Sequence, residues 1–291
     1  MDLNEALKSK YGSEVFIERR IPVSGGDINR AYALELSDGT RAFMKANRKE
    51  NADFFRAETE GLDAIRQTGT VRVPEVIAAG IDGDEAFLLL ENISSDSGSM
   101  KSSEELGTGL ARMHMADTSS FVDGGRFGFT NDNYIGAGKQ INDTKDNWIE
   151  FFIECRLVPQ FRRAESYFDR DERKKTDTFL NRIDRYISEP DYPSLLHGDL
   201  WAGNYLIDAD GHPWLIDPAA YVGHAEADLA MTELFGGFDR TFYDAYRATA
   251  GIDPGYRDRK DLYNLYHLLN HLNLFGSGYL YSVKSIINRY V

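Results

Sequence analysis

The 291-residue chain is long enough to bury a substantial core, either in one large domain or in two lobes. Its formal net charge of −14 argues against a nucleic-acid-binding surface, because affinity for a phosphate backbone needs clustered lysine and arginine. The sequence contains no long apolar run, its start does not resemble a signal peptide, and Cys155 is its single cysteine. We therefore expect a cytoplasmic protein without intramolecular disulfides that associates with neither membranes nor nucleic acids.

Residues 1–93 are predicted to form a small β-rich lobe with one helix. Apolar runs at 16–21 and 31–36 indicate two strands, joined by a turn that contains Gly25 and Gly26. Glycine allows backbone N–H groups to approach phosphate oxygens, so this turn is a candidate nucleotide-binding loop. The turn lacks the full G-x-G-x-x-G pattern, and most such turns form only a hairpin.

The next strand and the helix after it carry a candidate ion pair. Lys45 lies in the predicted strand 41–46, where a phosphate-contacting lysine of a kinase would stand. In the helix, Phe55, Glu58 and Leu62 follow at spacings of three and four residues, which places Glu58 on the inward apolar face. An inward carboxylate is costly unless it is paired, so we predict that Glu58 pairs with Lys45.

The chain then changes from strands to helices. Strands are expected around 73–79 and 86–90, followed by a polar serine- and glycine-rich segment at 94–99 that looks like a linker. We accordingly expect an α+β protein with two lobes, a small β-rich lobe at 1–93 and a larger, mainly helical lobe at 94–291.

Several features of the second lobe predict helices. Ser102 and Glu105 have the spacing of a capping box, and apolar runs indicate helices at 148–158 and 172–187. The segment 263–275 carries many aromatic residues at helical spacing, which is more typical of a core than of a binding site.

The stretch His197-Gly-Asp-Leu-Trp-Ala-Gly-Asn204 precedes two short apolar runs, 205–208 and 214–217. The residues between the two runs have turn chemistry, so the pair is predicted to be a β-hairpin. Because the start of the first strand lies beside the end of the second, we expect Asn204 and Asp217 to share one edge of the hairpin.

This arrangement matches the roles that aspartate and asparagine residues have in the active site of a kinase. Carboxylate and amide oxygens suit Mg²⁺, which usually takes one or two protein ligands and completes its shell with water and phosphate. Asp199, on the loop just before, is then the candidate base, with Asn204 and Asp217 as metal ligands for Mg-ATP. Each aspartate taken alone is better explained as an ordinary turn residue. The hinge that contacts adenine is assigned by position to Glu91, Asn92 and Ile93.

These motifs resemble the fructosamine (ketosamine) kinases, within the aminoglycoside-phosphotransferase and choline-kinase-like group of protein-kinase-like folds. The resemblance extends from about Ser24 to Gly276. Its most specific parts are the stretch 197–204 with Trp201 and the run 223–238, G-H-x-E-x-D-L-A-M…F-G-G-F.

The resemblance implies ATP-dependent phosphorylation of the sugar 3-hydroxyl of a ketosamine, such as a glycated amine or protein. The phosphorylated adduct then loses its sugar, which amounts to deglycation and protein repair. The resemblance also implies that Trp201 packs against the substrate, where its ring could attract a cationic amine. Two alternatives stay open: a phosphotransferase acting on an aminoglycoside or choline, and a nucleotide-binding scaffold without catalysis.

Overall fold

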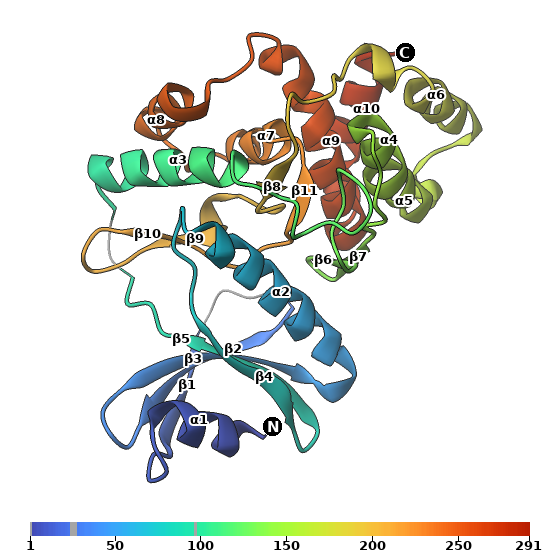
Figure 1. Ribbon diagram of the computed structural model, residues 1–291. Helices are drawn as coiled ribbons and strands as arrows, with labels where there is room; N and C mark the ends of the chain where they lie inside the picture. Colours follow the sequence, from blue (N-terminus) through green and yellow to red (C-terminus); the bar gives the residue numbers. More distant parts are fainter. Residues whose placement is uncertain (1, 24–27, 96–97) are drawn as a thin grey trace.

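The computed structural model describes residues 2–23, 28–95 and 98–291, and it shows a β-sheet lobe followed by a mainly helical lobe (Figure 1). The elements of the first lobe are α1 (Leu3–Tyr11), β1 (Ile17–Val23), β2 (Arg30–Leu36), β3 (Arg41–Arg48), η1 (Lys49–Asn51), α2 (Ala52–Thr68), β4 (Val76–Asp82) and β5 (Glu85–Glu91). The second lobe begins with α3 (Met100–His114), β6 (Asn133–Ile135), β7 (Gly138–Gln140), α4 (Trp148–Phe151), η2 (Phe152–Leu157), α5 (Val158–Arg163), η3 (Glu165–Tyr167), α6 (Arg170–Leu180) and η4 (Ile183–Arg185). It continues with β8 (Ser194–Leu196), η5 (Ala202–Asn204), β9 (Tyr205–Ile207), β10 (Pro213–Leu215), β11 (Tyr221–Gly223), α7 (Glu226–Leu234), α8 (Arg240–Ala250), α9 (Tyr256–Phe275), η6 (Ser277–Tyr279) and α10 (Leu280–Arg289).

The first lobe is built on a five-stranded antiparallel sheet with the order β1-β2-β3-β5-β4. Side chains of a strand alternate between the two faces of a sheet. In β5, Phe87 and Leu89 accordingly pack into the cluster that includes α1, whereas Leu88 and Leu90 pack into the cluster that includes α2. Lys45 of β3 stands directly opposite Leu88, so its side chain belongs to the α2 face.

The expectation of a single helix in the first lobe is wrong, because α1 is a second one. Asp2 caps this helix, with its side chain accepting from the Glu5 amide at 2.8 Å while the Glu5 carboxylate accepts from the Asp2 amide. Leu3 and Leu7 bury against the sheet. With so few apolar positions in nine residues, periodicity alone gave no signal for this helix.

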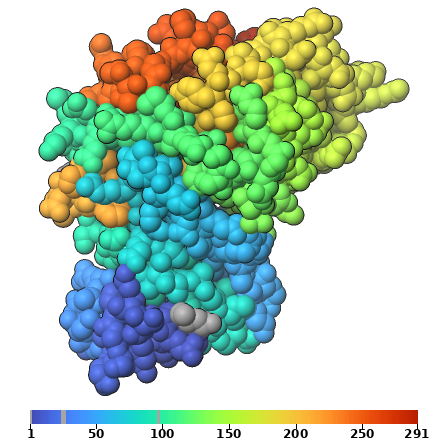
Figure 2. Space-filling model, viewed as in Figure 1, coloured from blue at the N-terminus to red at the C-terminus, as the bar shows by residue number. Residues whose placement is uncertain are grey.

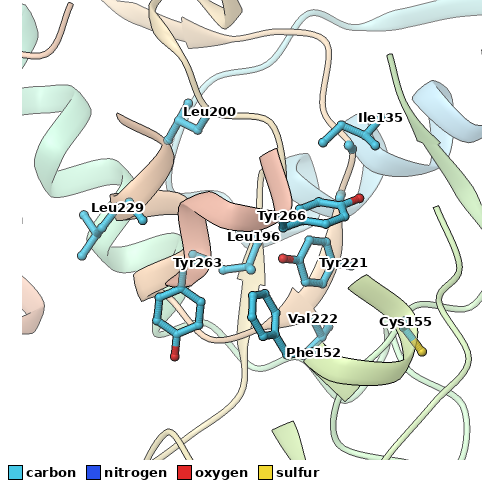
Figure 3. Packing of buried hydrophobic residues seen from close by; sticks show 14 of the residues in the cluster. Ile135, Phe152, Cys155, Leu196, Leu200, Tyr221, Val222, Leu229, Tyr263 and Tyr266 are labelled. Atoms are coloured by element: carbon cyan, nitrogen blue, oxygen red, sulfur yellow. The ribbon is translucent and has the colours of Figure 1, made fainter. Parts of the chain in front are cut away.

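The core of the second lobe gathers around α9. Figure 3 shows Tyr263 and Tyr266 of this helix beside Phe152, Leu196 and Tyr221. The rings of Phe152 and Tyr263 meet edge to face, with centroids 5.3 Å apart. This packing fixes the β8–β11 pair, in which Leu196 stands opposite Tyr221.

The helix predicted at 148–158 is interrupted, because residues 152–157 form the π-helical segment η2. This segment buries Arg156, whose guanidinium lies 3.9 Å from the centroid of the Tyr221 ring and donates to Asn142 Oδ1 at 2.8 Å. A π-helical turn of this kind inside an α-helix is rare.

Two predicted helix ends are also wrong. The cap of α3 is Ser99, whose side chain accepts from the Ser102 amide, while the Ser102 hydroxyl donates to the Gly211 carbonyl at 2.7 Å. The polar segment before Ser102 therefore supplies the cap itself. The helix expected at 172–187 ends at Leu180 in α6 and is followed by the short turn η4.

The two lobes are in contact through α2 (Figure 2). From the second lobe, Tyr134 donates to Asp53 at 2.9 Å and Asn131 donates to Glu60 at 3.2 Å. A boundary after residue 93 stays a prediction. Within the described ranges, no helix combines the length and apolarity that crossing a bilayer requires.

Candidate active site

The loop that follows β8 is held by a buried carboxylate. The backbone N–H groups of His197 and Gly198 donate to the two oxygens of Asp228 on α7, at 2.7 and 2.9 Å. Gly198 has a φ of +82°, and a Cβ at this position would overlap the carbonyl oxygen of Ala219. Only glycine fits both the backbone conformation and this contact.

The imidazole of His197 connects this loop with the strand pair β9–β10. Its Nε2 lies 2.8 Å from the carbonyl oxygen of Ile216, and its Nδ1 accepts from the Asp199 amide at 3.3 Å. These partners select the neutral tautomer that carries its proton on Nε2. Burial lowers the pKa of His197, which keeps the ring neutral.

Asp199 and Asn204 face each other within the loop. The Asn204 side-chain amide donates to the Asp199 carbonyl at 2.8 Å and to its carboxylate at 3.2 Å. Burial and the neighbouring carboxylate of Asp217 raise the pKa of Asp199 to about 7, despite the hydrogen bond from Asn204. No pattern in the sequence predicts this raised pKa, because it depends on burial and on the position of Asp217 in the fold.

The predicted hairpin is present, and it delivers Asp217 to the loop. Leu215 of β10 stands opposite Tyr205 of β9, and the Ile216 amide donates to the Asn204 carbonyl at 3.0 Å. Asp217 follows with a φ of +56°, the one positive φ of a non-glycine residue in the part of the chain that the structure describes. Such strained backbone is typical of functional positions.

Lys45 links both lobes at this point. Its ammonium lies 2.7 Å from Glu58 Oε1 and also contacts the carboxylate of Asp217. Burial disfavours the charged amine, but Asp217 and Glu58 outweigh this effect and hold the pKa of Lys45 above its ordinary value. The structure thus contains the predicted Lys45–Glu58 ion pair.

The donor set fits a magnesium ion. Because the Asn204 amide nitrogen is directed at Asp199, its carbonyl oxygen remains available to a cation. The side chain of Asp217 is 44% exposed, so a carboxylate oxygen is also open to solvent. Two hard oxygen ligands are enough for Mg²⁺ when phosphates complete the shell.

The other predicted site residues are distributed as follows. Trp201 is 41% exposed at the start of η5, with its ring directly over Gly203, where a Cβ would overlap it. Glu91 ends β5, and the partly buried Asn92 and Ile93 follow it toward α3. Gly25 and Gly26 lie outside the described residues.

Sequence reasoning missed the roles of Asp228 and His197. Asp228 is buried, and it also accepts from His114 Nε2 at 3.1 Å. Its ionised form is favoured by the hydrogen bonds from His114 and Gly198, which outweigh burial and lower its pKa. An aspartate directly before the apolar run Leu229-Ala230-Met231 was the available signal, because an inward carboxylate needs partners.

Three comparisons with known proteins identify the same family. The fructosamine kinase family model matches residues 1–291. The chloroplastic protein-ribulosamine 3-kinase of Arabidopsis thaliana is 41% identical over 272 residues, covering 92% of this chain and 81% of the relative. A crystal structure of a candidate fructosamine-3-kinase from Haemophilus somnus has a TM-score of 0.87 at 26% identity, covering 100% of this chain and 97% of that chain.

A more distant structure concerns the fold alone. An aminoglycoside phosphotransferase in complex with AMP-PNP and hygromycin B has a TM-score of 0.66 at 17% identity, covering 99% of this chain and 98% of that chain. The predicted two-lobed, kinase-like α+β fold is thereby confirmed.

Proposed function

Because the chain belongs to the fructosamine kinase family, we propose that it is an ATP-dependent kinase of ketosamines, with Asp199 as its catalytic base. Family membership makes it a phosphotransferase with an alcohol as acceptor. The finer proposal is that the acceptor is the sugar 3-hydroxyl of a fructosamine or ribulosamine. Loss of the phosphorylated sugar would then free the amine, a repair reaction that we place in the cytoplasm.

One observation carries the assignment of roles. Lys45 contacts Asp217, Asn204 donates to Asp199, and the amide of Ile216, just before Asp217, donates to the Asn204 carbonyl. Side chains from three separate parts of the chain are thereby brought together. Such preorganisation is what phosphoryl transfer requires, because positioning and charge neutralisation supply most of its catalysis.

In the proposed mechanism the substrate hydroxyl oxygen forms a bond to the γ-phosphorus as the bond to ADP breaks. Asp199 accepts the hydroxyl proton and is held in place by Asn204. Lys45, oriented by Glu58, provides positive charge for phosphate oxygens. Asn204 and Asp217 would hold Mg²⁺, which supplies charge neutralisation when bound with ATP. Gly25 and Gly26 are proposed to contact the phosphates, and the segment from Glu91 to Ile93 the adenine.

The test is an ADP-release assay with Mg-ATP and three acceptors: a fructosamine, a ribulosamine and an aminoglycoside. We expect turnover on the ketosamines only. Asp199→Asn should lower kcat by at least about a hundredfold and leave ATP binding nearly unchanged, because the base acts only on the acceptor. Asp210→Asn makes the same change at the exposed turn after β9 and should retain full activity. Turnover on the aminoglycoside alone would contradict the proposed substrate class.

A further inference from the structure

Besides Trp201, other aromatic side chains are exposed next to the catalytic loop, by which we mean residues 197–204. The side chains of Phe235, just after α7, and Phe275, at the end of α9, are 44% and 56% exposed. Both flank His271, whose ring centroid lies 4.9 Å from that of Phe235 and 5.4 Å from that of Phe275. The ring of Tyr279 completes the group, 5.1 Å from His271. We call Phe235, His271, Phe275 and Tyr279 the aromatic shelf.

The shelf is continuous with the catalytic loop. Two residues after Phe235, a Cβ on Gly237 would overlap the side chain of Ala202, which follows Trp201. The carbonyl of Gly237 also accepts from the Tyr205 hydroxyl at 3.2 Å. The segment that presents Phe235 is therefore in contact with the loop that carries Asp199.

The other end of the shelf lies where the second lobe meets the first. At Gly136, in the turn between β6 and β7, a Cβ would lie 2.8 Å from Leu274 of α9 and 3.7 Å from Ile28 of the first lobe. Figure 1 shows the end of α9 beside these two strands. The exposed rings thus extend from the loop 197–204 toward the first lobe.

The chemistry of the shelf suits a cationic, partly apolar ligand. His271 Nδ1 lies 2.8 Å from the carbonyl of His267, and burial lowers the pKa of His271, so the ring is neutral. Neutral aromatic faces attract ammonium groups and bury apolar carbon. An acceptor ketosamine contains such a group, because its amine nitrogen is basic, and the net charge of −14 favours cations over anions. Exposed apolar groups of this kind commonly mark binding sites.

We infer that the aromatic shelf binds the carrier of the ketosamine, meaning the amine and the groups attached to it beyond the sugar. This inference rests on the proposed function and narrows its substrate class. Trp201 and Asp199 would receive the sugar, which every substrate shares, and the shelf would distinguish among carriers. The favoured substrates are then ketosamines on bulky or aromatic carriers, such as a glycated lysine within a peptide, over small glycated amines.

The test compares two acceptors that share one sugar: ribulosyl-lysine with a small formyl group on its α-nitrogen, and the same molecule with a bulky aromatic group there. For Phe235→Ala and Phe275→Ala we expect KM for the bulky acceptor to rise on the order of tenfold. The kcat of both acceptors should change less than twofold, and KM for the small acceptor should rise less than KM for the bulky one, because the two acceptors share the amine but not the bulky group. Phe235→Leu separates an aromatic contribution from a merely apolar one, and its KM should lie between those of wild type and Phe235→Ala.

The matched control is Phe16→Ala, which removes a ring that is 57% exposed at the start of the first lobe, and it should alter neither KM. Thermal unfolding of each variant verifies that it is folded. Active variants with an unchanged preference between the two acceptors would overturn the inference and leave the proposed function standing. Absence of turnover by the wild type on both acceptors would overturn the two together.

Discussion

At the scale of single residues, Asp228 determines the shape of the catalytic loop without reaching the cleft. Its carboxylate binds two successive backbone N–H groups, those of His197 and Gly198, just before Asp199. A carboxylate has two accepting oxygens, whereas the isosteric asparagine has one. The position therefore needs aspartate for its hydrogen-bonding capacity as well as for its charge.

For Asp228→Asn we expect a loss of about 1–3 kcal/mol in the free energy of unfolding, because one buried N–H would face the new amide group. Measured well below the unfolding temperature of the variant, kcat should fall at least tenfold while KM for ATP changes little, since the displaced loop carries Asp199, the proposed base. Denaturant unfolding and steady-state kinetics provide the two measurements. A variant with lower stability but wild-type kcat would show that Asp228 supports the fold alone.

A second buried residue couples stability to pH. His267 of α9 is buried, and burial together with His271 on the same helix and Arg156 on η2 lowers its pKa to about 3, against the opposing effect of Asp228 on α7. The folded state therefore keeps His267 neutral at pH values where the unfolded chain, with a pKa near 6.5, binds a proton. Stability from this group is complete above pH 6.5 and is lost as the pH falls toward 3.

Protonation of His267 in the unfolded chain should lower the free energy of unfolding by about 2 kcal/mol when the pH falls from 7 to 5. A leucine side chain does not titrate, so His267→Leu should reduce the pH dependence of the free energy of unfolding by this amount. Urea titrations of both proteins at the two pH values make the measurement. An equal loss in wild type and variant would assign the acid sensitivity to other groups.

At the scale of elements, α2 determines whether Lys45 is positioned. The helix holds Glu58 against Lys45, and its Gly61 lies so close to the segment after Asp217 that a Cβ would stand 3.1 Å from Pro218 Cγ. The hydrogen bond from Tyr134 holds the start of the same helix. Contacts from the second lobe therefore keep the ion pair formed.

We predict that Gly61→Val separates α2 from Pro218, since a branched side chain cannot fit at this distance. Glu58 should then withdraw from Lys45, and KM for ATP should rise several-fold, while KM for the ketosamine changes less. Gln67→Val is the matched control, because it adds the same side chain at an exposed position of α2. Valine has a higher helix propensity than glycine, so a loss of helicity does not explain the effect at residue 61. If both variants raise KM for ATP equally, the contact with Pro218 is not the cause.

The elements also show which parts of the site could be predicted from sequence. The β9–β10 hairpin and the Lys45–Glu58 pair depend on local patterns, namely two short apolar runs around a turn and one carboxylate on an apolar helix face. Asp228 was missed because its partners lie about thirty residues away, and hydrogen bonds to backbone N–H groups leave no side-chain pattern. The exposed ring of Phe275 was assigned to the core for a related reason, because periodicity identifies a helix but not where its last turn leaves the core.

At the scale of the whole molecule, the net charge of −14 has opposite effects on the binding of the two proposed substrates. It opposes the approach of anionic ATP, which must be bound by local positive groups such as Lys45 and by its metal ion. It favours the approach of a basic acceptor, because the summed field raises the local concentration of cations. The two effects can be separated by saturating one substrate while varying the other.

With saturating Mg-ATP, we expect kcat/KM for a glycated peptide rich in lysine and arginine to fall about tenfold between 50 and 500 mM NaCl. The same glycated lysine in a neutral peptide should show a much smaller change, because screening removes only the charge-dependent part of association. If kcat stays constant for both peptides, the salt effect lies in the binding of the peptide. Equal salt dependence of the two peptides would contradict steering by the net charge and leave the aromatic shelf and Trp201 as the main determinants of acceptor binding.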